Sequence, residues 1–166
     1  MTSAPSNGRI FWTAALSIIV VDFVTKLLVV RYLTPYVPHD VLGSYGRLTL
    51  AFNQGAAFSM SVGGYSRIVF GTIATVALAA VGWWAWTTPP GEKMRILGLG
   101  LVWGGAAGNL MDRLRSGRGV VDFIDLGVGS VRFWVFNAAD SGVTIGACLL
   151  ALALWQDERR QRQSRE

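Results

Sequence analysis

The chain has 166 residues, of which 52% are hydrophobic and only 15% are charged, and its formal net charge is +5. Soluble globular domains average about 25% charged residues, so this composition excludes an ordinary soluble domain and indicates a membrane protein. The Lys and Arg residues stand at segment ends and in loops, without a basic stripe among exposed aromatics, so they fit anionic lipid headgroups better than nucleic acid.

Four apolar blocks of roughly 20 residues follow along the chain, a length that crosses the hydrocarbon core of a bilayer as a helix. They cover residues 11–30, 68–86, 94–113 and 135–155. No linker divides them, so we expect one integral-membrane domain over residues 1–166. The first block resembles a secretory signal in following a positive residue, but its length and its internal charges favour a retained helix.

Two charged residues of the first block, Asp22 and Lys26, are four residues apart and so share one face of a helix. An ion pair between them lowers the cost of placing either charge at membrane depth. We therefore predict a structural role for this pair rather than a direct part in chemistry.

The connection between the first two blocks, residues 33–66, is long and polar. Its prolines oppose a continued helix, and the alternation in residues 47–52 predicts short strands, so we expect a small β element on the membrane surface. In the segment 53–59, Gly55 permits a tight turn and Asn53 offers both a donor and an acceptor. Taken alone, Asn53 is better explained as a turn residue.

A short turn at residues 87–91 makes the second and third blocks antiparallel neighbours. The third block contains glycines at four-residue spacing that allow close helix contact, Gly100, Gly104 and Gly108. No P-loop Lys-Ser/Thr follows them, so they do not form a phosphate-binding loop. Asn109, Asp112 and Arg113 then share one helix face, either as a solvated helix end or as part of a site.

The stretch 108–141 joins two apolar blocks yet holds four of the ten acidic residues of the chain: Asp112, Asp122, Asp125 and Asp140. Carboxylates at membrane depth usually face a protein interior or a wet cavity. We predict that Asp122 and Asp140 meet, with Asn137 on the same helix face as Asp140. For Asp140 alone, a favourable interaction with the helix dipole is also an explanation.

Five motifs in this order resemble the lipoprotein signal peptidases, also called signal peptidase II. The resemblance runs over about 120 residues. The motifs are Asp22-x-x-Thr-Lys26, Asn53-x-Gly-Ala-Ala-Phe-Ser59, Gly-Gly-Ala-x-Gly-Asn109-x-x-Asp112-Arg113, Val-Val-Asp122-Phe and Phe-Asn137-x-Ala-Asp140-Ser141. One departure is residues 132–135, Arg-Phe-Trp-Val, where the family often has an aromatic-proline step.

This resemblance implies a mainly α membrane protein, with four transmembrane helices and a small extracytoplasmic β cradle between helices 1 and 2. It implies an aspartyl endopeptidase of the bacterial inner membrane that cuts prolipoproteins before a diacylglyceryl-modified cysteine and is blocked by globomycin, without metal or other cofactor. The catalytic pair falls on Asp122 and Asp140. The supporting positions are Asn53, Gly55, Asn109, Arg113 and Asn137, with Asp22 and Lys26 as a structural pair.

Orientation and rival functions stay open on the residues alone. The chain has 15 Lys and Arg residues, and all of them except Lys26 divide equally between the two sides of a four-span protein. The densest cluster is the C-terminal tail, so we expect both termini in the cytoplasm. Intramembrane acids also mark ion and substrate pathways, so a small transporter or proton-linked channel is the main rival, and a lipid-binding scaffold is a third possibility.

Overall fold

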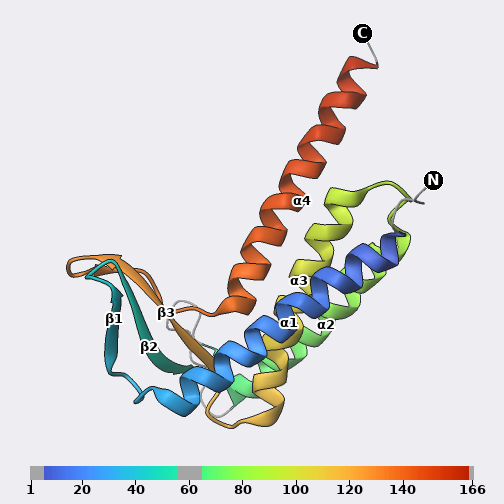
Figure 1. Cartoon of the computed structure of the whole chain (residues 1–166). Coiled ribbons are helices and arrows are strands. Elements are labelled where there is room, and N and C mark those ends of the chain that lie inside the picture. Colours follow the sequence, from blue (N-terminus) through green and yellow to red (C-terminus); the bar gives the residue numbers. More distant parts are fainter. Residues whose placement is uncertain (1–5, 56–64, 165–166) are drawn as a thin grey trace.

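The computed structural model of the chain describes residues 6–55 and 65–164, which form long helices with a small β-sheet at one end (Figure 1). Its elements, in chain order, are α1 (Asn7–Tyr32), β1 (Pro38–Leu42), β2 (Gly46–Asn53), α2 (Ser66–Thr87), α3 (Lys93–Arg115), β3 (Val120–Val128), β4 (Val131–Arg132) and α4 (Ala138–Gln163). The start of α1 lies beside the turn between α2 and α3, because the side chain of Asn7 donates to the carbonyls of Thr88 and Pro89.

Helix α3 is the centre of the helical part, since α1, α2 and α4 all pack against it. Its glycines permit this crowding, as the four-residue spacing predicted. A Cβ added at Gly104 would lie 2.6 Å from the carbonyl oxygen of Ala15 in α1, and one at Gly105 would lie 2.3 Å from the carbonyl oxygen of Ala139 in α4. Backbones therefore approach closely on two sides of α3.

Three helices of the described residues, α1, α2 and α4, are long and apolar enough to cross a membrane. Helix α3 has 23 residues but does not reach the same apolar character. Its polar end carries Asn109, Asp112, Arg113 and Arg115. Length and composition thus support three spans.

The sheet has four antiparallel strands in the order β1-β2-β3-β4. This corrects the expectation of a β element confined to the connection between the first two helices. Within the described residues, β1 and β2 come from that connection, whereas β3 and β4 come from residues between α3 and α4 (Figure 1). β2 needs a partner for its backbone groups, and the Val-rich segment 120–128 supplies one.

The sheet is attached to the helices by a small apolar core in which Val29 of α1 packs with Leu50, Val121 and Phe123. Leu50 is only 1% exposed. On its other edge, β3 pairs through Ile124 with Phe136, just before α4 begins. This arrangement brings β3 and the first turn of α4 next to each other, and these two segments carry Asp122 and Asp140.

Candidate active site

Asp122 is the third residue of β3 and is only 3% exposed. Each of its carboxylate oxygens accepts a hydrogen bond from a side-chain amide. Asn137 Nδ2 donates to Oδ1 at 2.7 Å, and Asn53 Nδ2 donates to Oδ2 at 3.1 Å. Asn53 ends the neighbouring strand β2, so the antiparallel pairing of β2 with β3 brings this amide to Asp122.

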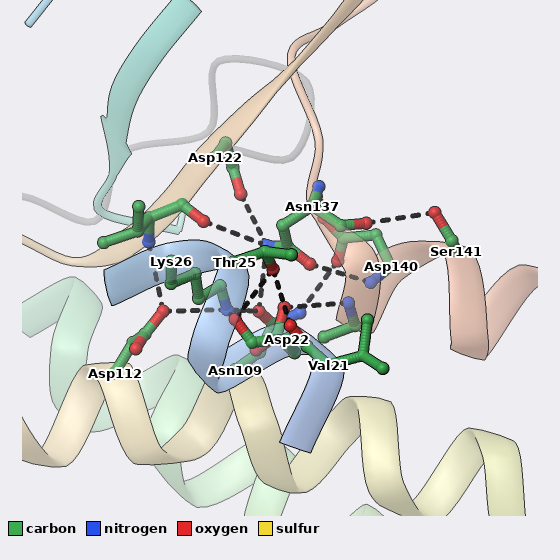
Figure 2. Close-up of polar contacts among 12 residues, drawn as sticks. Val21, Asp22, Thr25, Lys26, Asn109, Asp112, Asp122, Asn137, Asp140 and Ser141 are labelled. Carbon is green, nitrogen blue, oxygen red and sulfur yellow. Dashed lines mark hydrogen bonds and ion pairs between the residues drawn. The ribbon is translucent and has the colours of Figure 1, made fainter. Parts of the chain in front are cut away.

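Asp140 lies in the first turn of α4 and shares one partner residue, Asn137, with Asp122. Its Oδ1 accepts from Asn109 Nδ2 at 2.8 Å, and its Oδ2 accepts from the backbone N–H of Asn137 at 3.2 Å. Asn137 in turn accepts from the backbone N–H of Asp140 at 2.8 Å. Figure 2 shows that Asp122 on β3 and Asp140 on α4 both bond to Asn137, while Asn109 bonds to Asp140.

Asn137 precedes the helix rather than lying on the same helix face as Asp140. It is the N-cap of α4, with extended backbone angles and a reciprocal capping pattern with Asp140. Its side chain is fully buried and also donates to Asn109 Oδ1 at 3.1 Å. The amide can reach Asp122 because the chain is extended here and has not yet turned into the helix.

The surroundings of Asp122 disfavour its ionised form. Burial, and next the negative charge of Asp140, raise its pKa to about 6 from an ordinary value of 3.8. The hydrogen bonds from Asn53 and Asn137 and the positive charge of Lys26 act in the opposite direction. A buried carboxyl beside a second carboxyl therefore tends to keep a proton, as acid–base chemistry requires.

The predicted pair of Asp22 and Lys26 is formed, with Nζ of Lys26 2.7 Å from Asp22. Lys26 also lies 2.8 Å from Asp112 and donates to Asn109 Oδ1 at 3.0 Å. Both side chains of the pair are nearly buried, at 2% and 5% exposed. The pair is thus the middle of a larger cluster that connects to the amides of the site (Figure 2).

The two carboxylates bound by Lys26 hold the residues directly before Asp122 and Asp140. Asp112 Oδ2 accepts from the backbone N–H of Val121 at 3.1 Å, and Asp22 Oδ1 accepts from that of Ala139 at 2.9 Å. The sequence did not indicate these contacts, because they join segments far apart in the chain. The only available signal was the polar face of α3 that includes Asp112.

Gly55 fixes the orientation of Asn53. Its φ is +112°, which favours glycine, and its N–H donates to Asn53 Oδ1 at 2.9 Å, leaving the amide nitrogen for Asp122. A Cβ at this position would also meet the ring of Phe70 at 2.1 Å. The rest of this predicted motif, residues 56–59, lies outside the described residues.

Arg113 lies one helical turn beyond Asn109, donating to its carbonyl at 3.1 Å, and its guanidinium is 5.9 Å from the centre of the Phe70 ring. No carboxylate of the described residues lies within ion-pair distance of it. Its Nε is buried and has no hydrogen-bond partner among the described residues. Arg113, expected as a supporting position, therefore lies near the site without a direct ion pair to an acid of the described residues.

Asp125 and Ser141, two other polar residues of the stretch 108–141, bond to neither Asp122 nor Asp140 within the described part of the chain. Asp125 binds Arg132 at 2.8 Å and accepts from Thr49, so it ties β2, β3 and β4 together. The Ser141 hydroxyl donates to the backbone carbonyl of Asn137 at 3.1 Å. Asp122 and Asp140 are left as the acids that share a site.

A groove of about 650 Å³ opens beside Asn53. Aromatic side chains from the turn before β1, from β2 and from the segment before α4 line it, namely Tyr36, Phe52 and Trp134. Because Asn53 also bonds to Asp122, this groove reaches the edge of the site.

Comparison with known proteins agrees with this geometry. The family model described as signal peptidase (SPase) II matches residues 14–156. Proteins called lipoprotein signal peptidase in Hydrogenovibrio crunogenus and Geobacter metallireducens are 39% and 38% identical, over 90% and 93% of this chain and 88% and 96% of theirs. A solved structure described as a bacterial membrane enzyme is 29% identical, with a TM-score of 0.79 over 88% of this chain and 87% of the other.

The fold therefore matches that of a membrane enzyme, and the matching family is one of hydrolases. More specifically, the chain belongs to the signal peptidase II family, a family of peptidases.

Proposed function

We propose that the chain removes signal peptides from bacterial prolipoproteins, cutting on the N-terminal side of a diacylglyceryl-modified cysteine with Asp122 and Asp140 as an aspartyl dyad. The observation that carries the proposal is that both carboxyls bond to Asn137. Its side-chain amide donates to Asp122 at 2.7 Å, and its backbone N–H donates to Asp140 at 3.2 Å. Membership of the family supports the substrate class.

In the proposed reaction the dyad holds one proton, because two carboxyls this close do not both ionise easily. We place that proton on Asp122, whose burial raises its pKa to about 6. Asp140 then takes a proton from a water molecule while the oxygen of this water attacks the scissile carbonyl carbon. At the same time Asp122 protonates the carbonyl oxygen. When the tetrahedral intermediate collapses and the C–N bond breaks, Asp140 gives the proton it took from water to the leaving amine, and a hydroxyl of the intermediate returns a proton to Asp122.

For the topology, we propose that α3 crosses the membrane as a fourth span with both termini in the cytoplasm. The packing of α1, α2 and α4 around α3 supports this, because they shield its polar and glycine-rich surface from lipid. The sheet and the dyad then lie near the extracytoplasmic surface, opposite the start of α1 and the turn between α2 and α3 (Figure 1). Asp122 and Asp140 both lie near one end of the helices instead of forming a chain of acids across the bilayer, which favours a peptidase over a proton path.

The function is tested by incubating the purified protein in detergent with a prolipoprotein, either diacylglyceryl-modified or unmodified at its cysteine. The proposal predicts one cut directly before the modified cysteine, seen by mass spectrometry, and its inhibition by globomycin. A protein that cuts both substrates equally, or cuts at another bond, would contradict the proposed specificity.

The topology is tested separately by labelling intact spheroplasts with a membrane-impermeant maleimide. In a Cys148→Ala background, Ser44→Cys in the turn between β1 and β2 should react and Ser164→Cys beyond α4 should not. The opposite labelling would overturn the proposed orientation.

A further inference from the structure

A second cavity, of about 220 Å³, lies between α1, the end of α3 and the start of β3. Two arginines line it, Arg115 at the end of α3 and Arg118 in the loop that leads to β3. The groove beside Asn53 shares only the Arg118 and Phe52 side chains with this cavity, and neither dyad residue lines it.

Each of these arginines is held over an aromatic ring. The Arg115 guanidinium lies 4.9 Å from the centre of the Phe23 ring, and that of Arg118 lies 4.3 Å from the centre of the Phe52 ring. Stacking limits their motion while leaving N–H donors at the ring edges. Across residues 6–55 and 65–164, no carboxylate lies within 4.0 Å of either guanidinium.

Arg115 and Arg118 bring two positive charges to the lining of the cavity, and the acid that lines it is already bound. Asp112 lines the cavity, but its Oδ2 is bound by Lys26 and by the N–H of Val121. Both arginines are solvent-exposed, so they remain available to an anion. Paired guanidiniums suit the oxygens of a phosphate better than a single cation does.

The third wall of the cavity is apolar and belongs to a membrane helix. Phe23, Leu27 and Val30 of α1 line it, and Leu27 is 50% exposed. α1 is one of the helices long and apolar enough to span the bilayer, so this surface faces lipid. Two arginines and an apolar helix face in the lining of one cavity match a ligand that has an anionic head and a hydrocarbon tail.

We propose that this cavity binds one membrane phospholipid, with its phosphate between Arg115 and Arg118 and an acyl chain along Phe23, Leu27 and Val30. Bound in this way, the phosphate bridges the end of α3 to the loop before β3. It thereby steadies the segment that joins Asn109 to Asp122. The proposal does not depend on the peptidase activity, because it rests on the cavity and on α1 lying in a bilayer.

The test is lipid retention by the purified full-length protein in non-ionic detergent, followed by native mass spectrometry. Three probes are compared: phosphatidylglycerol, diacylglycerol with the same acyl chains, and inorganic phosphate. The wild type should retain one phosphatidylglycerol and neither of the other two. Equal retention of diacylglycerol would reduce the site to an apolar groove, and equal retention of inorganic phosphate would make it a free-phosphate site; either result overturns the proposal.

Matched variants locate the binding. Arg115→Gln with Arg118→Gln should weaken phosphatidylglycerol retention about tenfold or more, since two charge-assisted contacts are lost. Arg159→Gln with Arg160→Gln removes the same charge at the far end of α4, where Arg159 also stacks on a ring, Trp155, and should leave retention unchanged. The proposed site would be refuted if both double variants lost phosphatidylglycerol retention equally, or if the Arg115→Gln, Arg118→Gln variant lost none.

A folding check accompanies the variants. Circular dichroism should match that of the wild type, because both substituted arginines are exposed. Should the double variant unfold, the single variants Arg115→Gln and Arg118→Gln decide the question. Each should weaken retention, and unchanged retention in both would refute the proposal.

Discussion

Asp22 accepts a hydrogen bond from the backbone N–H of Ala139 at 2.9 Å and so joins α1 to the first turn of α4. A carboxylate is favoured at this helix N-terminus by the free N–H groups and by the helix dipole. Asp112 makes the matching contact to Val121, just before Asp122. Lys26 binds both carboxylates, so one cation supports the backbone on both sides of the dyad.

The first prediction concerns this cation. Replacing Lys26 by Met leaves Asp22 and Asp112 as unpaired charges in a nearly buried site, and breaking a buried pair in this way costs about 3–5 kcal/mol. We expect a clearly lower thermal midpoint in detergent and a loss of activity. Lys93→Met, at the exposed start of α3, is the matched control and should behave as the wild type. A Lys26→Met protein as stable as this control would contradict the supporting role.

The second prediction separates the two tasks of Asn137. In Asn137→Ala, the helix cap and the hydrogen bond to Asp122 are both lost, so stability should fall by about 1 kcal/mol or more and activity should fall strongly. Asn137→Ser keeps a side-chain oxygen that can cap α4, but it has no amide to donate to Asp122. It should regain most of the stability and little of the activity. Full activity of Asn137→Ala in a purified-enzyme assay would exclude the orienting role.

The third prediction is the pH dependence of turnover. The dyad must keep one proton, and the pKa of Asp122 is raised to about 6. As pH rises above that value the last proton leaves, so kcat/KM of the free enzyme should decline about tenfold per pH unit. A profile of kcat/KM that stays flat from about pH 5 to about pH 8 would not agree with this dyad.

The same pKa shift predicts the pH dependence of stability. Since the native pKa of Asp122 lies above its ordinary value of 3.8, the folded protein binds more protons than the unfolded chain between the two values. The contribution of Asp122 to the free energy of unfolding therefore decreases as pH rises through this window. Asp122→Asn should lack this contribution, and thermal midpoints measured at several pH values compare the two proteins. If the thermal midpoints of the two proteins changed in parallel with pH, the raised pKa would not belong to Asp122.

The fourth prediction tests the close contact of α3 with α4. A Cβ at Gly105 would meet the carbonyl oxygen of Ala139 at 2.3 Å and the side chain of Val143 at 2.8 Å. Gly105→Ala should therefore push the start of α4 away and destabilise the fold by about 1–3 kcal/mol. Gly8→Ala in α1 is the control, because a Cβ added at Gly8 would meet nothing within 4 Å. Thermal unfolding of the two variants side by side gives the comparison, and equal midpoints would rule out tight packing at Gly105.

Local features of this fold were predictable from sequence, and long-range ones were not. The pairing of Asp22 with Lys26 follows from helix geometry alone, as does the close approach at Gly104. The strand that carries Asp122 was missed, because its hydrogen-bonding partner β2 lies more than 60 residues earlier in the chain. Asn137 was placed inside a helix, since the sequence does not distinguish a cap residue from the first turn.

The site was predictable to a similar extent. The meeting of Asp122 and Asp140 was inferred from the cost of carboxylates at membrane depth, and the structure brings both to Asn137. The contacts from Asp112 to Val121 and from Asp22 to Ala139 were not inferred. They depend on how β3 and α4 dock against α1 and α3, which no local pattern encodes.

The measurement that tests the account most directly is cleavage of a diacylglyceryl-modified prolipoprotein by the wild type, Asp122→Asn and Asp140→Asn. Asp40→Asn, an exposed carboxyl on β1, is the control for the same chemical change. We predict that both dyad variants fold but lose activity by roughly 10³-fold or more, while the control cuts normally. Normal cleavage by either dyad variant, or no cleavage by the wild type, would contradict the aspartyl mechanism.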